Sequence, residues 1–190
     1  MNEDWTEYHQ LTKDKAPSPL LKEALSFVRN KNTALDLGAG ALVDSKFMLS
    51  TGFKKVVAVD FVSFEPSIND PRFIFIKSSF SGYDFPVKEF DLINANFALP
   101  FSDPESFNPV WTKMINSLVV GGIFSGQLFG INDGWSTNTS MSFHTMVQVK
   151  KLLADTEIIK LGEIEKDGSI ATGEVKHWHV FPLILKRVKT

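Results

Sequence analysis

Two short segments of the sequence combine glycines and carboxylates at a spacing that suits a nucleoside ligand. Residues 34–42 form an apolar run that ends in Gly38-Ala39-Gly40, and residues 56–60 form an apolar run that ends in Asp60. Glycines let a ligand approach the backbone closely, and a carboxylate can accept hydrogen bonds from the two hydroxyls of a ribose. The pattern therefore predicts a nucleoside-binding βαβ unit.

A second group of residues has side chains suited to proton transfer. His177 and His179 flank Trp178 in a predicted strand, so both imidazoles should face one side of the sheet and the indole the other. His144 or Asp133 could complete a metal site or an acid/base pair, and a polar strand face without a special role is the simpler interpretation. We name His144, His177 and His179 as candidate catalytic residues, and we predict no metal site.

Size and composition limit the class of protein. A chain of 190 residues with 43% hydrophobic residues fits one domain with one core. The net charge is -2 and basic residues are scattered, which argues against a nucleic-acid partner. The chain has no cysteine, and none of its apolar runs reaches the roughly 20 residues that cross a bilayer. We expect a soluble cytoplasmic protein with no membrane partner, and its oligomeric state stays open.

Apolar patterning places strands and helices in alternation along most of the chain. The expected strands of the core are 33–37, 55–60, 73–77, 90–94 and 123–129. Ser18 should cap a helix that begins at Pro19, and Asp44 should cap the helix after the glycine loop. A further helix should end at Gly121-Gly122, because glycine commonly stops a helix in the left-handed conformation.

The end of the chain changes character. Residues 157–164 and 175–185 are strand-like, and the short connection with Asp167-Gly168 favours an antiparallel hairpin. The expected fold is α/β and doubly wound, with a mostly parallel seven-stranded sheet and an antiparallel C-terminal hairpin. We expect one domain over 1–190, with a core at 33–185 and an N-terminal helical cover at 1–30, where Trp5 and Tyr8 could close over the site as a lid.

Two common ligands use such a unit, a dinucleotide and S-adenosylmethionine, and the loop alone does not separate them. The dinucleotide pattern has a third glycine where this chain has Val43, and the other pattern has one where this chain has Leu42. A bulky Leu42 side chain could also narrow the pocket. Both ligands remain open on the evidence of the loop.

Features beyond the loop decide between the two ligands. Together with Asp36-x-Gly38-x-Gly40 in the loop, they are Asp60, the stretch Phe90 to Phe101, Gly121-Gly122 and the terminal hairpin. With these features the sequence resembles the class I S-adenosylmethionine-dependent methyltransferases over most of residues 33–185. Within that class it looks most like small single-domain enzymes of the tellurite- and thiopurine-methyltransferase kind.

The resemblance implies a set of cofactor contacts. Asp36 and the glycine loop would lie against the amino-acid part of S-adenosylmethionine, Asp60 would hold the ribose hydroxyls, and Phe61 would flank the adenine. The residues after the third strand would contact the adenine edge, and those at the end of the fourth would lie beside the sulfonium. The implied cofactor-binding residues are Asp36, Gly38, Ala39, Gly40, Asp60, Phe61, Ser79, Phe80, Asn94, Asn96 and Phe97.

The predicted function is transfer of a methyl group from S-adenosylmethionine to a small-molecule acceptor by in-line displacement, with S-adenosylhomocysteine as the product. The alternatives are a non-catalytic cofactor-binding or protein-interaction member of the fold and an NAD(P)-dependent oxidoreductase. Asn94-Ala95-Asn96-Phe97 is similar to the tetrad of methyltransferases that modify amino groups of nucleic acids, but it lacks the two prolines. The identity of the acceptor is not encoded in a motif.

Overall fold

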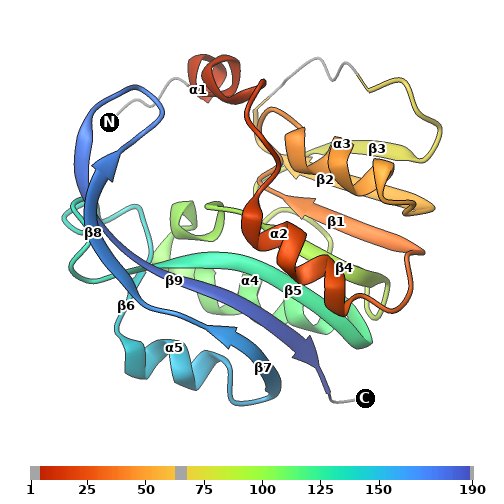
Figure 1. Ribbon diagram of the computed structural model, residues 1–190. Helices are drawn as coiled ribbons and strands as arrows, with labels where there is room; N and C mark the ends of the chain where they lie inside the picture. Colours follow the sequence, from red (N-terminus) through yellow and green to blue (C-terminus); the bar gives the residue numbers. More distant parts are fainter. Residues whose placement is uncertain (1–4, 63–67, 189–190) are drawn as a thin grey trace.

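A single twisted sheet runs through the computed structural model, which describes residues 5–62 and 68–188 (Figure 1). The strands are β1 (Thr33–Leu37), β2 (Lys55–Asp60), β3 (Phe73–Lys77), β4 (Phe90–Ala95), β5 (Leu118–Gly130), β6 (Phe143–His144), β7 (Thr156–Leu161), β8 (Ile164–Ser169) and β9 (Val175–Arg187). The helices are α1 (Trp5–Thr12), α2 (Pro19–Ala24), α3 (Val43–Ser50), α4 (Pro104–Ser117) and α5 (Met146–Leu152), with short 3-10 helices η1 (Leu25–Phe27) and η2 (Leu99–Phe101).

The strand order confirms the predicted fold class. It is β3-β2-β1-β4-β5-β9-β7, with β6 paired to β5 and β8 paired to β9. Strands β1 to β5 are parallel, whereas β9 is antiparallel to β5, β7 and β8. The chain changes direction across the sheet between β1 and β4, and ligands of open α/β sheets bind beyond the carboxyl ends of the strands at such a switch point.

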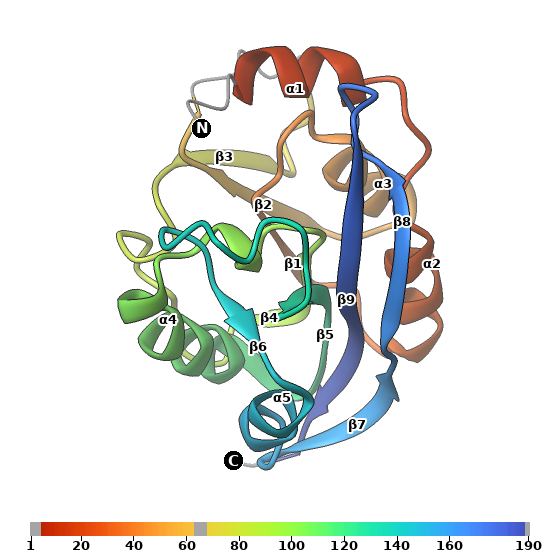
Figure 2. The ribbon, with the colours of Figure 1, turned by 90° about the vertical axis from the view of Figure 1, so that its left-hand side faces the viewer.

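Alternate residues of the central strands build two separate core layers. Ala34 packs in the layer of Leu21 and Met48, which α2 and α3 place on one face of the sheet. Its neighbour Leu35 packs in the layer of Trp111, which α4 places on the other face. Figures 1 and 2 show the helices on both sides of the sheet. Each residue of β1 is buried, as expected for a parallel strand covered on both faces.

The start of α2 confirms the sequence prediction for this helix. Ser18 is the N-cap, its hydroxyl accepts a hydrogen bond from the backbone N–H of Leu21, and Pro19 occupies the first helical position. A proline suits that position because its missing N–H would have no partner in the helix. The cap therefore fixes where the chain turns onto the sheet.

Two predicted turns lie elsewhere. Helix α4 ends at Ser117, and Gly121-Gly122 belong to β5, at an irregular place in its pairing with β4. Gly121 has the positive φ (83°) expected of a turn glycine, but it uses this conformation inside a strand. Asp167-Gly168 lie in β8 and pair with β9, so the chain reverses after β8 instead. In both places strand pairing overrides the local preference of the sequence.

The glycine at the end of β1 is required by close packing as well as by its backbone angle. Gly38 has φ 73°, and a Cβ atom built there would lie 2.4 Å from the Cβ of Ala98. Gly52, after α3, also has a positive φ (98°), but no atom lies within 4 Å of its would-be Cβ. The two glycines therefore share a backbone conformation that would strain any other residue, and they differ in crowding.

We predict that Gly38→Ala destabilises the protein more than Gly52→Ala. Each alanine enters the left-handed region, at a cost of about 1–2 kcal/mol. Only Gly38→Ala adds overpacking, which costs about 1–3 kcal/mol more. Urea denaturation of both variants measures the two free energies of unfolding. Equal losses would show that Ala98 does not crowd this position.

Candidate functional site

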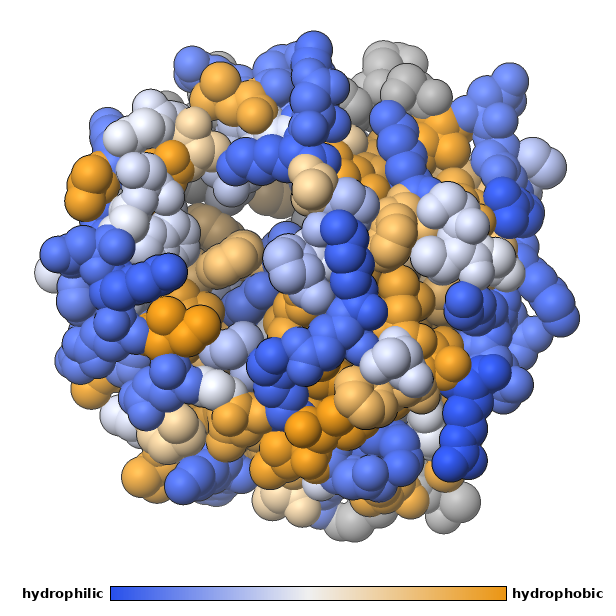
Figure 3. Space-filling view, in the orientation of Figure 1, coloured by the Kyte–Doolittle hydropathy of each residue, from blue (hydrophilic) through white to orange (hydrophobic). Residues whose placement is uncertain are grey.

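A large cavity lies where the carboxyl ends of the central strands meet α1 and the turn between β8 and β9. Its volume is about 1230 Å³. Figure 3 shows the hollow between α1 and the β8–β9 hairpin of Figure 1. Single-ligand sites usually measure roughly 300–1,000 Å³. The cavity therefore has room for two small molecules side by side.

The predicted cofactor residues lie together around this cavity. All of them except Asn94 contribute to its wall, from the ends of β1, β2 and β4 and from the segment after β3. The residues in the wall are Asp36, Gly38, Ala39, Gly40, Asp60, Phe61, Ser79, Phe80, Asn96 and Phe97. We call the part of the wall formed by Asp36, the glycine loop, Asp44, Asp60, Phe61, Ser79 and Phe80 the acidic end; Asn96 and Phe97 lie outside it.

Leu42 does not narrow the cavity. It has φ 62°, the left-handed conformation that explains the preference for glycine at this position in related loops. Its side chain is fully buried and packs with Ala39 and Ala58 on the far side of the loop, outside the cavity wall. The left-handed conformation of Leu42 therefore strains the backbone, but its side chain takes up none of the space for a ligand.

Asn94 lies behind the cavity wall and organises it. Its side chain is fully buried, and its Nδ2 donates hydrogen bonds to Oδ1 of Asp36 at 2.9 Å and to Oδ2 of Asp44 at 3.0 Å. Its Oδ1 accepts a hydrogen bond from the hydroxyl of Ser125 at 3.3 Å. The family resemblance implied that Asn94 would lie beside the sulfonium, whereas in the structure its amide donates hydrogen bonds to two carboxyl groups.

Asp36 and Asp44 form a buried acid pair. Burial, followed by the nearby Asp44 carboxylate, raises the pKa of Asp36 to about 7, although Ser45 and Asn94 donate hydrogen bonds to it. Burial also raises the pKa of Asp44, against the hydrogen bond from the backbone N–H of Ser18. The helix-cap prediction for Asp44 was wrong: it lies inside α3 and binds Ser18 of another helix. A cationic ligand group would favour the ionised form of both carboxyls.

Asp60 is held rigidly at the end of β2. Its Oδ2 accepts a hydrogen bond from the backbone N–H of Gly40 at 2.9 Å, and its Oδ1 accepts one from that of Val62 at 3.0 Å. Carboxylate oxygens have further lone pairs, so both can still accept hydrogen bonds from a ligand. The glycine loop and the carboxylate therefore act as one unit.

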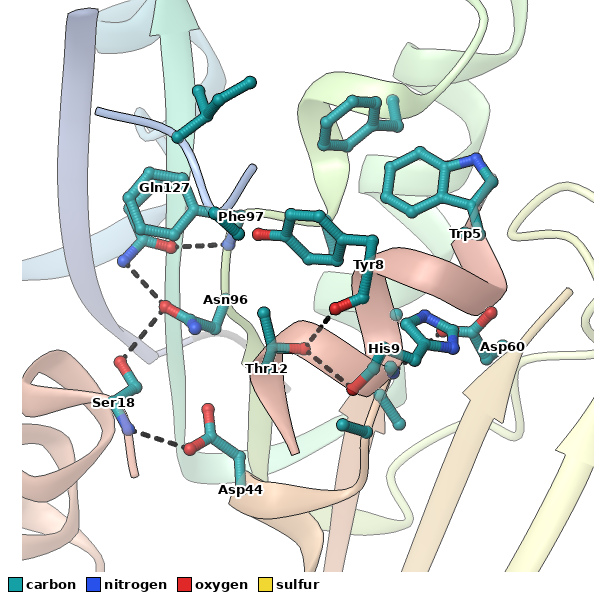
Figure 4. Close-up of a pocket in the computed structure, with 18 of the residues that line it drawn as sticks. Trp5, Tyr8, His9, Thr12, Ser18, Asp44, Asp60, Asn96, Phe97 and Gln127 are labelled. Carbon is teal, nitrogen blue, oxygen red and sulfur yellow. Dashed lines mark hydrogen bonds between the residues drawn. The ribbon is translucent and has the colours of Figure 1, made fainter. Parts of the chain in front are cut away.

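Helix α1 brings a residue to the acidic end that the sequence analysis did not identify. His9 is buried in the cavity wall, and its ring would lie 3.4 Å from a Cβ atom at Gly40. Burial lowers the pKa of His9, and the charge of Asp60 acts in the opposite direction. Figure 4 shows His9 between Tyr8 and Asp60. Only its place next to Tyr8, in the predicted lid, could have drawn attention to it.

The opposite end of the cavity is aromatic. Phe97 has φ 52°, and its backbone N–H donates to Oε1 of Gln127 at 2.8 Å. Together with four other aromatic residues of the cavity wall it forms a set that we call the aromatic chamber: Phe97, Phe101, Phe129, Trp135 and Trp178. The ring centroids of neighbouring residues in this set are about 6 Å apart, a distance at which edge-to-face pairs attract.

None of the three candidate catalytic histidines lines the cavity. His177 binds Asp167 and Glu165 on the outer face of the hairpin, and His179 binds Glu163. His144 packs against Phe107, and burial lowers its pKa to about 4. The predicted alternation in β9 is present, but it turns Trp178 toward the cavity and the two histidines away from it. The placement gives no support to a role in proton transfer.

Among residues 5–62 and 68–188, no three His, Cys, Asp or Glu side chains are arranged to hold a metal ion. In the same part of the chain, none of the helices has the length and apolar character needed to span a membrane.

The chain is similar to solved structures of methyltransferases, whereas no protein-family model and no curated protein matches it. One is the structure of Burkholderia thailandensis 1,6-didemethyltoxoflavin-N1-methyltransferase with bound 1,6-didemethyltoxoflavin and S-adenosylhomocysteine. It is 19% identical to this chain with a TM-score of 0.67, and the match covers 97% of this chain and 84% of that chain. Another is N-methyltransferase NodS from Bradyrhizobium japonicum, with 12% identity and TM-score 0.68 over 100% of both chains. TehB from Haemophilus influenzae has 14% identity and TM-score 0.72, covering 95% of this chain and 65% of that chain. The chain thus has the fold of S-adenosylmethionine-dependent methyltransferases.

We predict that Asp36→Asn removes a pH-dependent loss of stability. With a pKa of about 7 in the fold against an ordinary 3.8, Asp36 lowers the free energy of unfolding as the pH rises from about 4 to about 7. Asparagine keeps an acceptor for Asn94 and can donate to the hydroxyl of Ser45. Thermal denaturation should show the variant more stable than wild type by at least about 2 °C at pH 8, with no advantage at pH 4.

Asp84→Asn is the matched control, because Asp84 is exposed and lies outside the cavity. It should not change the difference between the melting temperatures at pH 8 and pH 4. If both variants retain the pH profile of the wild type, Asp36 is not the group that titrates.

Proposed function

We propose that the protein is an S-adenosylmethionine-dependent methyltransferase that acts on a small molecule. The observation that carries the proposal is the acidic end of the cavity. There a glycine loop, the rigid carboxylate of Asp60 and the buried acid pair of Asp36 and Asp44 meet at the switch point of the sheet. The fold shared with methyltransferases supports the same assignment.

The residues at this end fit the groups of the cofactor. S-adenosylmethionine carries two cationic groups, an ammonium and a sulfonium, and either would favour the ionised forms of Asp36 and Asp44, whose pKa values are raised chiefly by burial. Asp60 has oxygens for the ribose hydroxyls, and the loop with Gly38 and Gly40 lines the cavity, with the His9 ring next to Gly40. Phe61 and Phe80 offer apolar faces for the adenine.

The chain's own contribution to the reaction is position and shielding. S-adenosylmethionine, when bound, supplies a methyl group on a positively charged sulfur, which is already a strong electrophile. In such a transfer the carbon–sulfur bond would break with its electron pair left on sulfur as the bond to the acceptor atom forms, and any proton that the acceptor loses would leave with the solvent after the product is released. Alignment of the two reactants supplies most of such a rate. Helix α1, through His9 and Tyr8, covers the site and limits the entry of water.

A small-molecule acceptor is supported by the size of the cavity. α1 and the β8–β9 turn both border it, and its volume of about 1230 Å³ leaves room for a second small ligand beside the cofactor. The matching methyltransferase from Burkholderia thailandensis was crystallised with a small molecule, 1,6-didemethyltoxoflavin. The net charge of -2 also disfavours a nucleic-acid acceptor.

We predict that S-adenosylhomocysteine binds the wild type and that Asp60→Ala weakens its binding at least about tenfold, because hydrogen bonds to a charged group are worth roughly 1.5–3 kcal/mol. Isothermal titration calorimetry measures both affinities. Asp84→Ala removes an exposed carboxylate outside the cavity and should bind as the wild type does. Undiminished binding by Asp60→Ala, or tight binding of NAD in place of S-adenosylhomocysteine, would overturn the cofactor assignment.

A separate measurement distinguishes an enzyme from a non-catalytic member of the fold. The wild type should form S-adenosylhomocysteine from S-adenosylmethionine in the presence of a suitable acceptor, detected in a coupled assay across thiol, amine, hydroxyl and carboxylate acceptors. Binding without turnover on any acceptor would favour the non-catalytic alternative.

A further inference from the structure

The two ends of the cavity differ in chemistry. The buried ionisable side chains in its wall are His9, Asp36, Asp44 and Asp60, all at the acidic end. The other charged residues of the wall lie on exposed positions at the rim. The aromatic chamber thus has no buried charge in its described wall, and a ligand there would meet ring faces and edges.

A buried lysine packs against the rings of the chamber, and its charge is paired. Lys176 lies behind the rings, with its Nζ 3.7 Å from the ring centroid of Trp135, 4.1 Å from that of Trp178 and 4.6 Å from that of Phe129. Its ammonium is paired with the buried carboxylate of Asp133. Lys176 does not line the cavity, and its charge is paired. It therefore holds the rings of the chamber in place without attracting an anion into it.

The junction of the two ends carries an amide with an unused donor. Oδ1 of Asn96 accepts hydrogen bonds from the hydroxyl of Ser18 at 3.1 Å and from Nε2 of Gln127 at 3.0 Å (Figure 4). Oε1 of Gln127 accepts a hydrogen bond from the backbone N–H of Phe97. This bond fixes which atom of the Gln127 amide is oxygen, and the bond from Gln127 then fixes the same for the amide of Asn96. No residue of the described ranges accepts a hydrogen bond from Nδ2 of Asn96, although Asn96 belongs to the cavity wall.

From these contacts we infer that the methyl acceptor is a planar, uncharged aromatic or heteroaromatic molecule that stacks in the aromatic chamber and accepts a hydrogen bond from Nδ2 of Asn96 through a carbonyl oxygen or ring nitrogen. The inference rests on the proposed function, because it assigns the acidic end to the cofactor. The aromatic rings that line the chamber offer apolar faces and edges to a flat ligand, and a charge placed among them would lose its hydration without a partner.

The binding test uses protein saturated with S-adenosylhomocysteine and four probes in isothermal titration calorimetry. 2-Quinolone is planar and neutral with a carbonyl, and its fully saturated analogue keeps the carbonyl without the flat rings. 2-Naphthoate and 1-methylquinolinium are planar with a negative and a positive charge. We expect 2-quinolone to bind at least about tenfold more tightly than the other three, since stacking and the hydrogen bond both contribute.

Two matched pairs of variants test the walls. Phe101 and Phe143 each pack 6.3 Å from Phe129, but only Phe101 lines the cavity. Phe101→Leu should weaken 2-quinolone binding about three- to tenfold, the loss expected for one aromatic contact, and Phe143→Leu should not.

Asn96→Asp keeps the acceptor for the Ser18 hydroxyl and removes the Nδ2 donor, so it should weaken the binding of 2-quinolone at least about tenfold. Asn138→Asp, outside the cavity, should leave binding unchanged.

The outcomes separate this inference from the proposed function. If S-adenosylhomocysteine does not bind, both fail. If S-adenosylhomocysteine binds but 2-quinolone does not, or the saturated or charged probes bind as tightly, the assignment of the acceptor fails and the cofactor assignment stands. Equal losses within either matched pair would show that Phe101 or Asn96 acts on the fold and not on the ligand.

Discussion

The whole site depends on the amide of Asn94, which holds two carboxylates that would otherwise repel each other. Through Asp36, Asp44 and Ser125 it joins β1, α3 and β5 to β4, and through Asp44 it reaches Ser18 at the start of α2. Burial and mutual repulsion still raise the pKa of Asp36 to about 7. The fold therefore maintains a deficit of positive charge at the switch point of the sheet, which is where a cationic cofactor would be stabilised most.

The distribution of charge along the cavity follows from the strands that form its wall. β1 and β2 contribute Asp36 and Asp60 at their carboxyl ends, whereas β5 and β9 contribute Phe129 and Trp178. The proposed methyl transfer requires a cationic donor and an acceptor in contact, and the two environments would hold one reactant each where they meet within one cavity. Asn96, which is bound to Gln127 of β5 and to Ser18 next to α2, ties the two ends together.

Local patterns predicted the elements well where one interaction dominates. The strands of the parallel core are continuous apolar runs because both faces are buried, and Ser18-Pro19 starts α2 because its cap needs only neighbouring backbone. Predictions that depended on partners distant in sequence were wrong. Asp44 binds Ser18, 26 residues away, in place of capping its own helix, and Gly121 serves a strand irregularity instead of a helix end.

The sequence by itself determined the fold class and most of the acidic end, because the glycine loop and Asp60 lie at strand ends that the apolar pattern already locates. Only the tertiary structure decided what surrounds them. It turned Leu42 away from the cavity, brought His9 onto the loop, moved Asn94 behind the wall and pointed Trp178, not the flanking histidines, inward. The reason is physical: period-two alternation shows that neighbouring side chains of a strand face opposite sides, but only packing against the other elements decides which side encloses the cavity.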